Sequence, residues 1–308
     1  MNTSQSTNAS SDMVVVDINR LTGLGVELVM LTFGTVLNLL LIVTHIKDPL
    51  KTFKSPSSSF ILNIAFVDIL VCILWIIKII LNIISPGYRV NKETGDVLFC
   101  VWTASIAISP LLYLCLSIER FCSVAYPLWH RVHITTRACR YLLCAIWIVH
   151  IIFETLVSCL VPSPISNERV IIMLLYSGMS FIFGQVFYLA TYISLKKQRG
   201  RLFKRQNISE STLGTMKIRL HREKQFLHTI AIVCLILNFT FLPSLGFMIF
   251  RAFHPDFRNI KQRELSCISF KLMLTVFLSF NFAINPIVYV WRLPKYRKTF
   301  KLLYCKSL

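Results

Sequence analysis

Seven long apolar runs, separated by short polar segments, limit what this chain can fold into. They lie at about residues 23–46, 58–84, 97–125, 139–161, 169–195, 225–252 and 266–291. A helix needs about 20 apolar residues to cross the hydrocarbon core of a bilayer. Because lipid offers no hydrogen-bond partners, each crossing segment must pair its own backbone groups, as a helix does. The runs therefore predict an all-α fold, a seven-transmembrane helix bundle over residues 23–291.

Composition agrees with a chain that lies in the bilayer. The sequence is 55% hydrophobic and only 15% charged, whereas a soluble domain of this length carries more charge. The formal net charge of +19 could indicate nucleic-acid binding. However, the charges lie between the apolar runs, and no basic face interleaved with aromatic residues occurs outside them. We therefore expect a lipid bilayer and no nucleic acid as a partner.

The charge of the connecting segments predicts the orientation of the bundle. Segments 47–57, 126–140 and 196–224 are rich in Lys, Arg and His, whereas 85–96, 162–168 and 253–265 are mixed in sign or nearly neutral. Basic segments stay on the cytoplasmic side of a membrane. The N-terminus is therefore expected outside the cell and the C-terminus inside.

The two ends of the chain fit this orientation. Residues 1–22 are expected to form a short extracellular N-terminus, with glycosylation sequons at Asn2 and Asn8. Residues 292–308 begin with alternating basic and apolar residues, which predicts a short amphipathic eighth helix on the inner leaflet and a short tail. Cys305 follows that helix, and we interpret it as a palmitoylation site or as a plain free thiol.

Several polar residues lie in the middle of the apolar runs. A carboxylate such as Asp68 costs about 2.5–3.5 kcal/mol at the centre of a spanning helix, so it needs partners or a wet cavity. Asn38, Ser109, Asn281 and Asn285 are also mid-span. Either one polar cluster collects all five residues, or they form separate bonds between helices, worth about 0.6 kcal/mol each.

A proline in the last apolar run also requires an explanation. Pro286 removes a backbone hydrogen bond and is expected to kink its helix. The carbonyl that it frees must find a partner inside the protein, and the adjacent Asn285 is a plausible one.

Two motifs carry a resemblance to a known family. The last run contains Asn285-Pro286-Ile287-Val288-Tyr289, and the third ends in Glu119-Arg120-Phe121. Together they resemble rhodopsin-like G protein-coupled receptors. The resemblance implies a plasma-membrane receptor that binds an extracellular ligand and activates a heterotrimeric G protein.

Arg120 is the centre of the switch that this resemblance implies. Glu119 can hold its guanidinium locally and Glu223 can hold it across helices, and breaking the second pair would open a groove for a G protein. The alternative is an ordinary salt bridge among many basic neighbours. The other matching switch residues are Tyr188, Tyr289, Phe241, Pro243, Asn285 and Pro286. The family usually has Cys-Trp-x-Pro where this chain has Thr-Phe-Leu-Pro.

The resemblance also implies an allosteric sodium ion, and no other cofactor is expected. The matching residues are Asp68, Ser109, Asn281 and Asn285. The residues by themselves indicate only a buried anionic site.

The chain departs from the family pattern in its cysteines. Gly95 stands where the family has its helix 3 cysteine, and the short loop 162–168 contains no cysteine. A bond between Cys100 and Cys159 remains open, because distances cannot be read from sequence. This loop, and Ser180 in place of the usual proline, resemble the melanocortin receptors, and the tail looks like the melanocortin–adenosine group. Those receptors carry acidic residues for a cationic peptide where this chain has Lys78, so such a ligand is not expected.

The ligand class is constrained mainly by exclusion. Ser279 stands where an opsin has its retinal lysine, and Trp102 stands where amine receptors have an aspartate. The pocket candidates are Lys78, Trp75, Trp102, Glu154, Phe241 and Lys271. Lys78 either meets an anionic group on the ligand or extends to the interface.

Two other interpretations stay open. A membrane transporter or channel would show inverted repeats or several charges along one path, and neither is visible. A receptor-like protein without ligand-driven coupling would also fit the altered sixth-helix motif. The sequence holds no catalytic constellation, so an enzyme is not expected.

Overall fold

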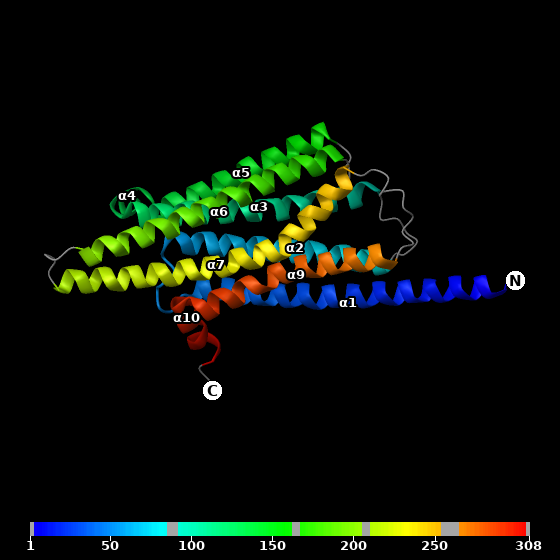
Figure 1. The fold of residues 1–308 in the computed structure, drawn as a ribbon, viewed down its shortest axis with the longest axis horizontal. Coiled ribbons are helices and arrows are strands. Elements are labelled where there is room, and N and C mark those ends of the chain that lie inside the picture. Colours follow the sequence, from blue (N-terminus) through cyan, green and yellow to red (C-terminus); the bar gives the residue numbers. More distant parts are fainter. Residues whose placement is uncertain (1–2, 85–91, 162–166, 205–209, 254–264, 306–308) are drawn as a thin grey trace.

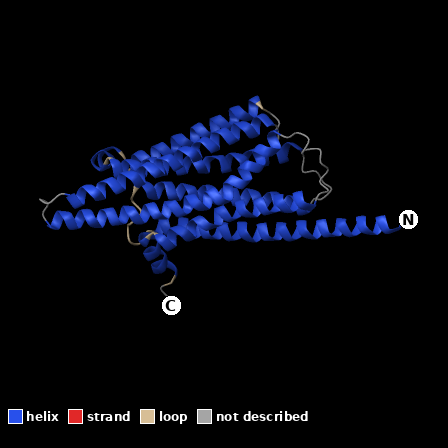
Figure 2. Ribbon diagram, in the orientation of Figure 1, coloured by secondary structure: helices blue, strands red, loops and turns tan. Residues whose placement is uncertain are grey.

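The computed structural model describes residues 3–84, 92–161, 167–204, 210–253 and 265–305. All regular structure in these residues is helical, and no strand occurs among them (Figure 2). The helices are α1 (Thr3–Lys47), α2 (Pro56–Ile84), α3 (Lys92–Ala125), α4 (Pro127–His133), α5 (Thr136–Leu160), α6 (Asn167–Lys204), α7 (Glu210–Phe253), α9 (Leu265–Arg292) and α10 (Pro294–Tyr304). The predicted all-α class is confirmed.

The long helices lie side by side in one bundle, with the two short helices at the same end (Figure 1). We call this the α4–α10 end. The long helices α6 and α7 project beyond it, and α10 turns away from the bundle after α9. The N-terminal part of α1 extends past the opposite end.

Five helical segments of the described residues are long and apolar enough to cross a membrane. They are Leu21–Lys47, Pro56–Leu81, Cys100–Ala125, Thr136–Leu160 and Ile171–Gln198. A sixth is counted if Val276–Arg292 and Pro294–Tyr304 form one broken span, although they meet at 96°. That angle fits a spanning α9 followed by a separate amphipathic helix. The chain is a multi-pass membrane protein.

Two features of the helices differ from the prediction. The first helix begins at Thr3, well before the predicted span at residue 23. In addition, α4 lies inside segment 126–140, which the sequence marks only as basic. Its seven residues are too few for a periodic apolar signal. Pro127 occupies the first turn of α4, a position that tolerates proline because that N–H has no helical partner.

Close helix approach depends on small residues. A Cβ added to Gly34 of α1 would lie 3.4 Å from the backbone of Ala283 in α9. Gly184 of α6 similarly approaches the backbone of Leu114 in α3, at 3.6 Å. In lipid, such small residues let backbones pack closely, because helix association depends on van der Waals contact and polar bonds. The α1–α9 approach brings the polar residues of both helices within bonding reach.

Candidate functional site

The kink proline of α9 finds its partner on another helix. Pro286 removes the N–H that would bond the Phe282 carbonyl one turn earlier. The Nδ2 of Asn38 in α1 donates to that carbonyl at 2.8 Å and to the Gly34 carbonyl at 2.9 Å. The expectation that Asn285 would satisfy the freed carbonyl is therefore wrong. The close α1–α9 contact allows a side chain from α1 to do so.

Asn285 instead reaches the mid-span carboxylate. Its Nδ2 donates to Oδ2 of Asp68 at 3.0 Å, and both residues are buried. The Oγ of Ser109 and the Oδ1 atoms of Asn281 and Asn285 are buried with no hydrogen-bond partner within the described part of the chain. Hard oxygen donors beside a carboxylate are what a small cation takes as ligands. The four residues fit a sodium site, whereas Asn38 serves the backbone of α9.

Arg120 lies near the α4–α10 end and is bound by its neighbour in two places. Its Nε is 2.6 Å from Oε2 of Glu119, and one terminal nitrogen is 2.5 Å from Oε1. This is the parallel arrangement that suits a planar guanidinium and a carboxylate. The carboxylate side chain is only 3% exposed, so the pair is screened from solvent.

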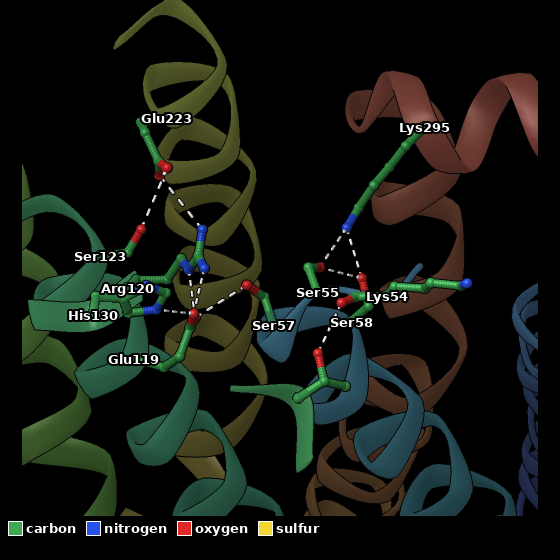
Figure 3. Close-up of polar contacts among 11 residues, drawn as sticks. Lys54, Ser55, Ser57, Ser58, Glu119, Arg120, Ser123, His130, Glu223 and Lys295 are labelled. Atoms are coloured by element: carbon green, nitrogen blue, oxygen red, sulfur yellow. Dashed lines mark hydrogen bonds and ion pairs between the residues drawn. The ribbon is translucent and has the colours of Figure 1, made fainter. Parts of the chain in front are cut away.

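A second carboxylate binds Arg120 from α7. The other terminal nitrogen lies 3.4 Å from Oε2 of Glu223, and the Ser123 hydroxyl lies 3.5 Å from Oε1 (Figure 3). The guanidinium also lies over the Phe226 ring, 4.7 Å from its centroid, which adds a cation–π contact on the same helix. The structure thus places Arg120 between α3 and α7, as the sequence pairing with Glu223 predicts.

Two further groups bind Glu119 that the sequence did not indicate. The Ser57 hydroxyl donates to Oε2 at 3.0 Å from the start of α2. The Nε2 of His130 in α4 lies 2.9 Å from Oε1. Figure 3 shows both converging on the same carboxylate. His130 was missed because its loop was not expected to be helical, and Ser57 because a hydroxyl at a helix start is common.

The two switch tyrosines have separate partners. The Tyr188 hydroxyl donates to the Leu227 carbonyl of α7 at 3.2 Å. Tyr289 is buried, with its ring 6.3 Å from that of Tyr296 in α10. Tyr188 therefore joins α6 to α7 and Tyr289 lies against α10, while Arg120 is held by Glu223.

Lys295 ties α10 to the start of α2. Its Nζ donates to Ser58 at 2.7 Å and to Ser55 at 3.2 Å (Figure 3). The amine also lies over the Phe53 ring, 5.7 Å from its centroid. Burial, followed by the positive charge of Arg120, lowers the pKa of Lys295 to about 8. Electrostatics therefore couple α10 to the Arg120 cluster. This contact could not be predicted from the sequence, because Lys295 lies within a run of basic residues.

Three pocket candidates meet between α2 and α3. The rings of Trp75 and Trp102 pack edge to face with centroids 5.2 Å apart. Lys78 places its Nζ 4.7 Å from the centroid of the Trp102 ring. The head of Lys78 therefore lies against an aromatic face of the neighbouring helix, which argues against extension to the interface.

Glu154 forms an ion pair that the sequence did not indicate. A terminal nitrogen of Arg169 in α6 lies 3.7 Å from Oε2 of Glu154 in α5, and both residues are buried. The two terminal nitrogens of Arg169 also bond the Ser158 hydroxyl at 3.2 Å. Arg169 is the first residue of the fifth predicted span, so a search for opposite charges at span ends would have found this pair.

The remaining predicted positions are placed as follows. Pro243 lies inside α7, which bends along its length in Figure 1. The side chains of Phe241, Lys271 and Asn8, and all of Asn2, lie outside the described residues. Cys100 and Cys159 are both free, so the structure does not form the bond between them. Cys305 is exposed immediately after α10, where a thiol is accessible.

Comparison with protein-family models places the site within a known family. The model of the 7 transmembrane receptor (rhodopsin family) matches residues 37–289, which include the Asp68 cluster, the Glu119–Arg120 pair and Pro286. A comparison with curated proteins found no match. The matched segment covers most of the chain, from the first spanning helix to the tyrosine that ends the α9 motif. This chain belongs to the rhodopsin family of seven-transmembrane receptors.

Proposed function

We propose that this protein is a plasma-membrane receptor that activates a heterotrimeric G protein when a ligand binds at the extracellular end of the bundle. The α4–α10 end faces the cytoplasm in this proposal, in agreement with the basic segments at that end. The observation that carries the proposal is Arg120 held between Glu119 on α3 and Glu223 on α7. A transporter has no comparable support, because the family match is to receptors.

The mechanism follows from the two carboxylates. The ion pair of Arg120 with Glu223 is weaker than its ion pair with Glu119. The nitrogen–oxygen distance is 3.4 Å for Glu223 and 2.5 Å for Glu119, and the Glu223 side chain is more exposed. Separation of α7 from α3 therefore breaks the Glu223 contact first. Arg120 then presents free donors in a newly opened groove, where a G protein helix can bind them. A ligand that favours the open bundle shifts the population toward this state.

The pair with Glu223 gives a direct test. Replacing Glu223 with alanine is expected to raise ligand-independent nucleotide exchange about threefold to tenfold, because a partly exposed charged bond contributes about 1 kcal/mol to the closed state. The assay uses the full chain in lipid nanodiscs with purified G proteins. Replacing Glu210, at the start of the same helix, is the matched control and leaves exchange unchanged. No rise in any G protein would favour an ordinary salt bridge.

We also propose that Asp68, Ser109, Asn281 and Asn285 hold a sodium ion that stabilises the closed bundle. The support is the buried carboxylate with unpartnered oxygens around it. Replacing potassium with sodium is then expected to raise the thermal unfolding midpoint of the receptor, since an ion that binds only the folded state stabilises it. Asp68→Asn removes this response. An equal sodium response in both proteins would contradict the site.

The ligand is proposed to contact Trp75, Trp102 and Lys78, with Glu154, Phe241 and Lys271 as further candidates. An aromatic pair beside an ammonium group suits a ligand with an apolar body and an anionic group. Retinal and biogenic amines are not expected as ligands, because Ser279 and Trp102 stand where opsins and amine receptors have their ligand-binding lysine and aspartate. The resemblance to the melanocortin and adenosine group goes beyond the family match and stays a prediction. Glycosylation of Asn2 and Asn8 and lipidation of Cys305 belong to the same proposal.

A further inference from the structure

Glu119 accepts hydrogen bonds from three helices, and one of the donors is a histidine. Arg120 comes from α3 itself, Ser57 from α2, and His130 from α4 (Figure 3). His130 lies 11 residues from Glu119 in sequence, on a separate short helix. The carboxylate that holds Arg120 is thus also attached to the loop helix beside it.

The donors share the two carboxylate oxygens evenly. Oε1 accepts from His130 at 2.9 Å and from Arg120 at 2.5 Å. Oε2 accepts from Ser57 at 3.0 Å and from Arg120 at 2.6 Å. An ionised carboxylate offers about four lone-pair sites, so all four bonds can coexist. His130 and Ser57 therefore fix the plane in which Glu119 faces the guanidinium.

We propose that His130 is a positioning residue of the Arg120 switch, and that its ring holds Glu119 more firmly when both ring nitrogens are protonated. The inference rests on the proposed function, in which the α4–α10 end faces the cytoplasm. A neutral ring donates one hydrogen bond to the carboxylate. A charged ring makes that bond charge-assisted at both ends, which makes it roughly twice as strong. Histidine is the side chain whose charge ordinarily changes between pH 5 and 8.

The direction of the pH effect depends on whether the closed or the open bundle contains the contact between His130 and Glu119. The contact between His130 and Glu119 belongs to the closed bundle, in which Glu119 holds Arg120. Protons therefore bind the closed state in preference, and acidification of the cytoplasm shifts the population toward it. The receptor is expected to be less active at low cytoplasmic pH.

The charged and titratable groups near His130 lie on several helices. Glu119 contacts the ring directly, and Arg120 shares its acceptor oxygen. The groups at greater distance are Glu223 on α7, Cys139 on α5, Lys295 on α10, and Arg131 and His133 on α4. The His133 ring stacks on Trp129, with its Nδ1 3.0 Å from that residue's carbonyl, so it has a partner within its own helix.

The test measures opening of the bundle without a G protein. Spin labels carried by non-canonical amino acids replace the exposed residues Leu128 on α4 and Ile218 on α7. The full chain lies in nanodiscs and carries Glu223→Ala, which populates the open form. The fraction of long label distances is measured at about pH 7.5 and at about pH 6, both within the range of pH 5 to 8 in which a histidine ordinarily changes its charge.

Variants of His130 distinguish the effect of its positive charge from the effect of its hydrogen bond to Glu119. With His130 present, the open fraction is expected to fall about threefold on acidification. His130→Gln keeps a donor that cannot gain a charge, so its open fraction does not change with pH. His130→Phe has no donor and is more open than His130→Gln at both pH values. His133→Gln behaves like the parent protein.

Two results would overturn the proposal. The first is the same pH response with and without His130. The second is an open fraction that rises on acidification, which would place the proton on Glu119 instead.

A double-mutant cycle gives a second, independent measurement. The cycle compares the thermal unfolding of three variants, His130→Gln, Glu119→Gln and the double variant. The difference between the double variant and the sum of the single variants gives the coupling energy of the two residues. The coupling is expected to be larger at about pH 6 than at about pH 7.5, and equal values would contradict the proposal. If the spin labels show the same distance in every variant, the bundle does not open and the proposed Arg120 switch fails. The double-mutant cycle alone then decides whether His130 positions Glu119. If opening responds to pH but no G protein is activated, only the proposed function fails.

Discussion

Replacing Arg120 with alanine is expected to reduce ligand-independent G protein activation at least tenfold, while the protein still folds and reaches the membrane. The guanidinium is always charged and presents five donors in a rigid fork. Hydrogen bonds to charged groups contribute about 1.5–3 kcal/mol each, and about 1.4 kcal/mol is a factor of ten. In the open state the fork of Arg120 is the group that a G protein helix would bind, so the loss falls on coupling.

The fold should tolerate the change. Glu119 keeps its bonds to Ser57 and His130, so its carboxylate is not left without partners when the arginine is removed. The thermal unfolding midpoint is therefore expected to change little. This separates a coupling defect from a folding defect in the same preparation.

The measurement is nucleotide exchange on purified heterotrimeric G proteins. The Arg120 variants are made in the Glu223→Ala protein, whose higher basal activity makes a loss easier to detect. Arg120→Lys keeps the charge but loses the fork, and it is expected to retain intermediate activity. Arg131→Ala removes an exposed arginine at the same end and serves as the matched control. Exchange by Arg120→Ala equal to that of the parent would refute the role given to Arg120.

Replacing Arg169 with methionine is expected to destabilise the receptor by about 3–5 kcal/mol, the largest stability effect that we predict. The arginine is 2% exposed and lies against Glu154 on the neighbouring helix. Removing it leaves the Glu154 carboxylate buried without its counter-ion. The pair joins α5 to α6.

Thermal unfolding of the full chain in nanodiscs provides the measurement. Glu154→Gln alone is expected to cost less, because Arg169 keeps its two bonds to the Ser158 hydroxyl. The double variant Arg169→Met with Glu154→Gln should recover part of the loss, since no uncompensated charge remains. Arg140→Met changes an exposed arginine of α5 and should have little effect. Additive losses in the double variant would show that the two residues do not act as a pair.

Periodicity predicts the helices and burial cost singles out Asp68, whereas the Arg120 switch is predicted from the resemblance to the receptor family. The apolar runs predicted the long helices because a spanning segment must satisfy its own backbone. Asp68 was singled out because a mid-span carboxylate is costly without partners, and it is indeed buried against Asn285. The resemblance pairs Arg120 with Glu223, and the two side chains lie 3.4 Å apart.

Contacts between helices that are distant in sequence depended on packing. Asn38 binds the Phe282 carbonyl across a separation of 244 residues, and only the close Gly34–Ala283 approach makes that reach available. The adjacent Asn285 was the nearer choice along the chain, yet it bonds the carboxylate of Asp68 instead. Proximity in sequence was a poor guide because the packed helices α1 and α2 offer each of these polar groups a partner.

The sequence by itself determined the seven-helix architecture, the proposed orientation and the motif residues, because these depend on local hydrophobicity, charge and spacing. Only the tertiary structure decided which groups complete each cluster. His130 meets Glu119 because a short helix folds back after α3, and Arg169 meets Glu154 because its long side chain reaches from the first turn of α6 to α5. A polar residue in an apolar run indicates that the side chain needs a partner, but which partner it has depends on how the helices pack.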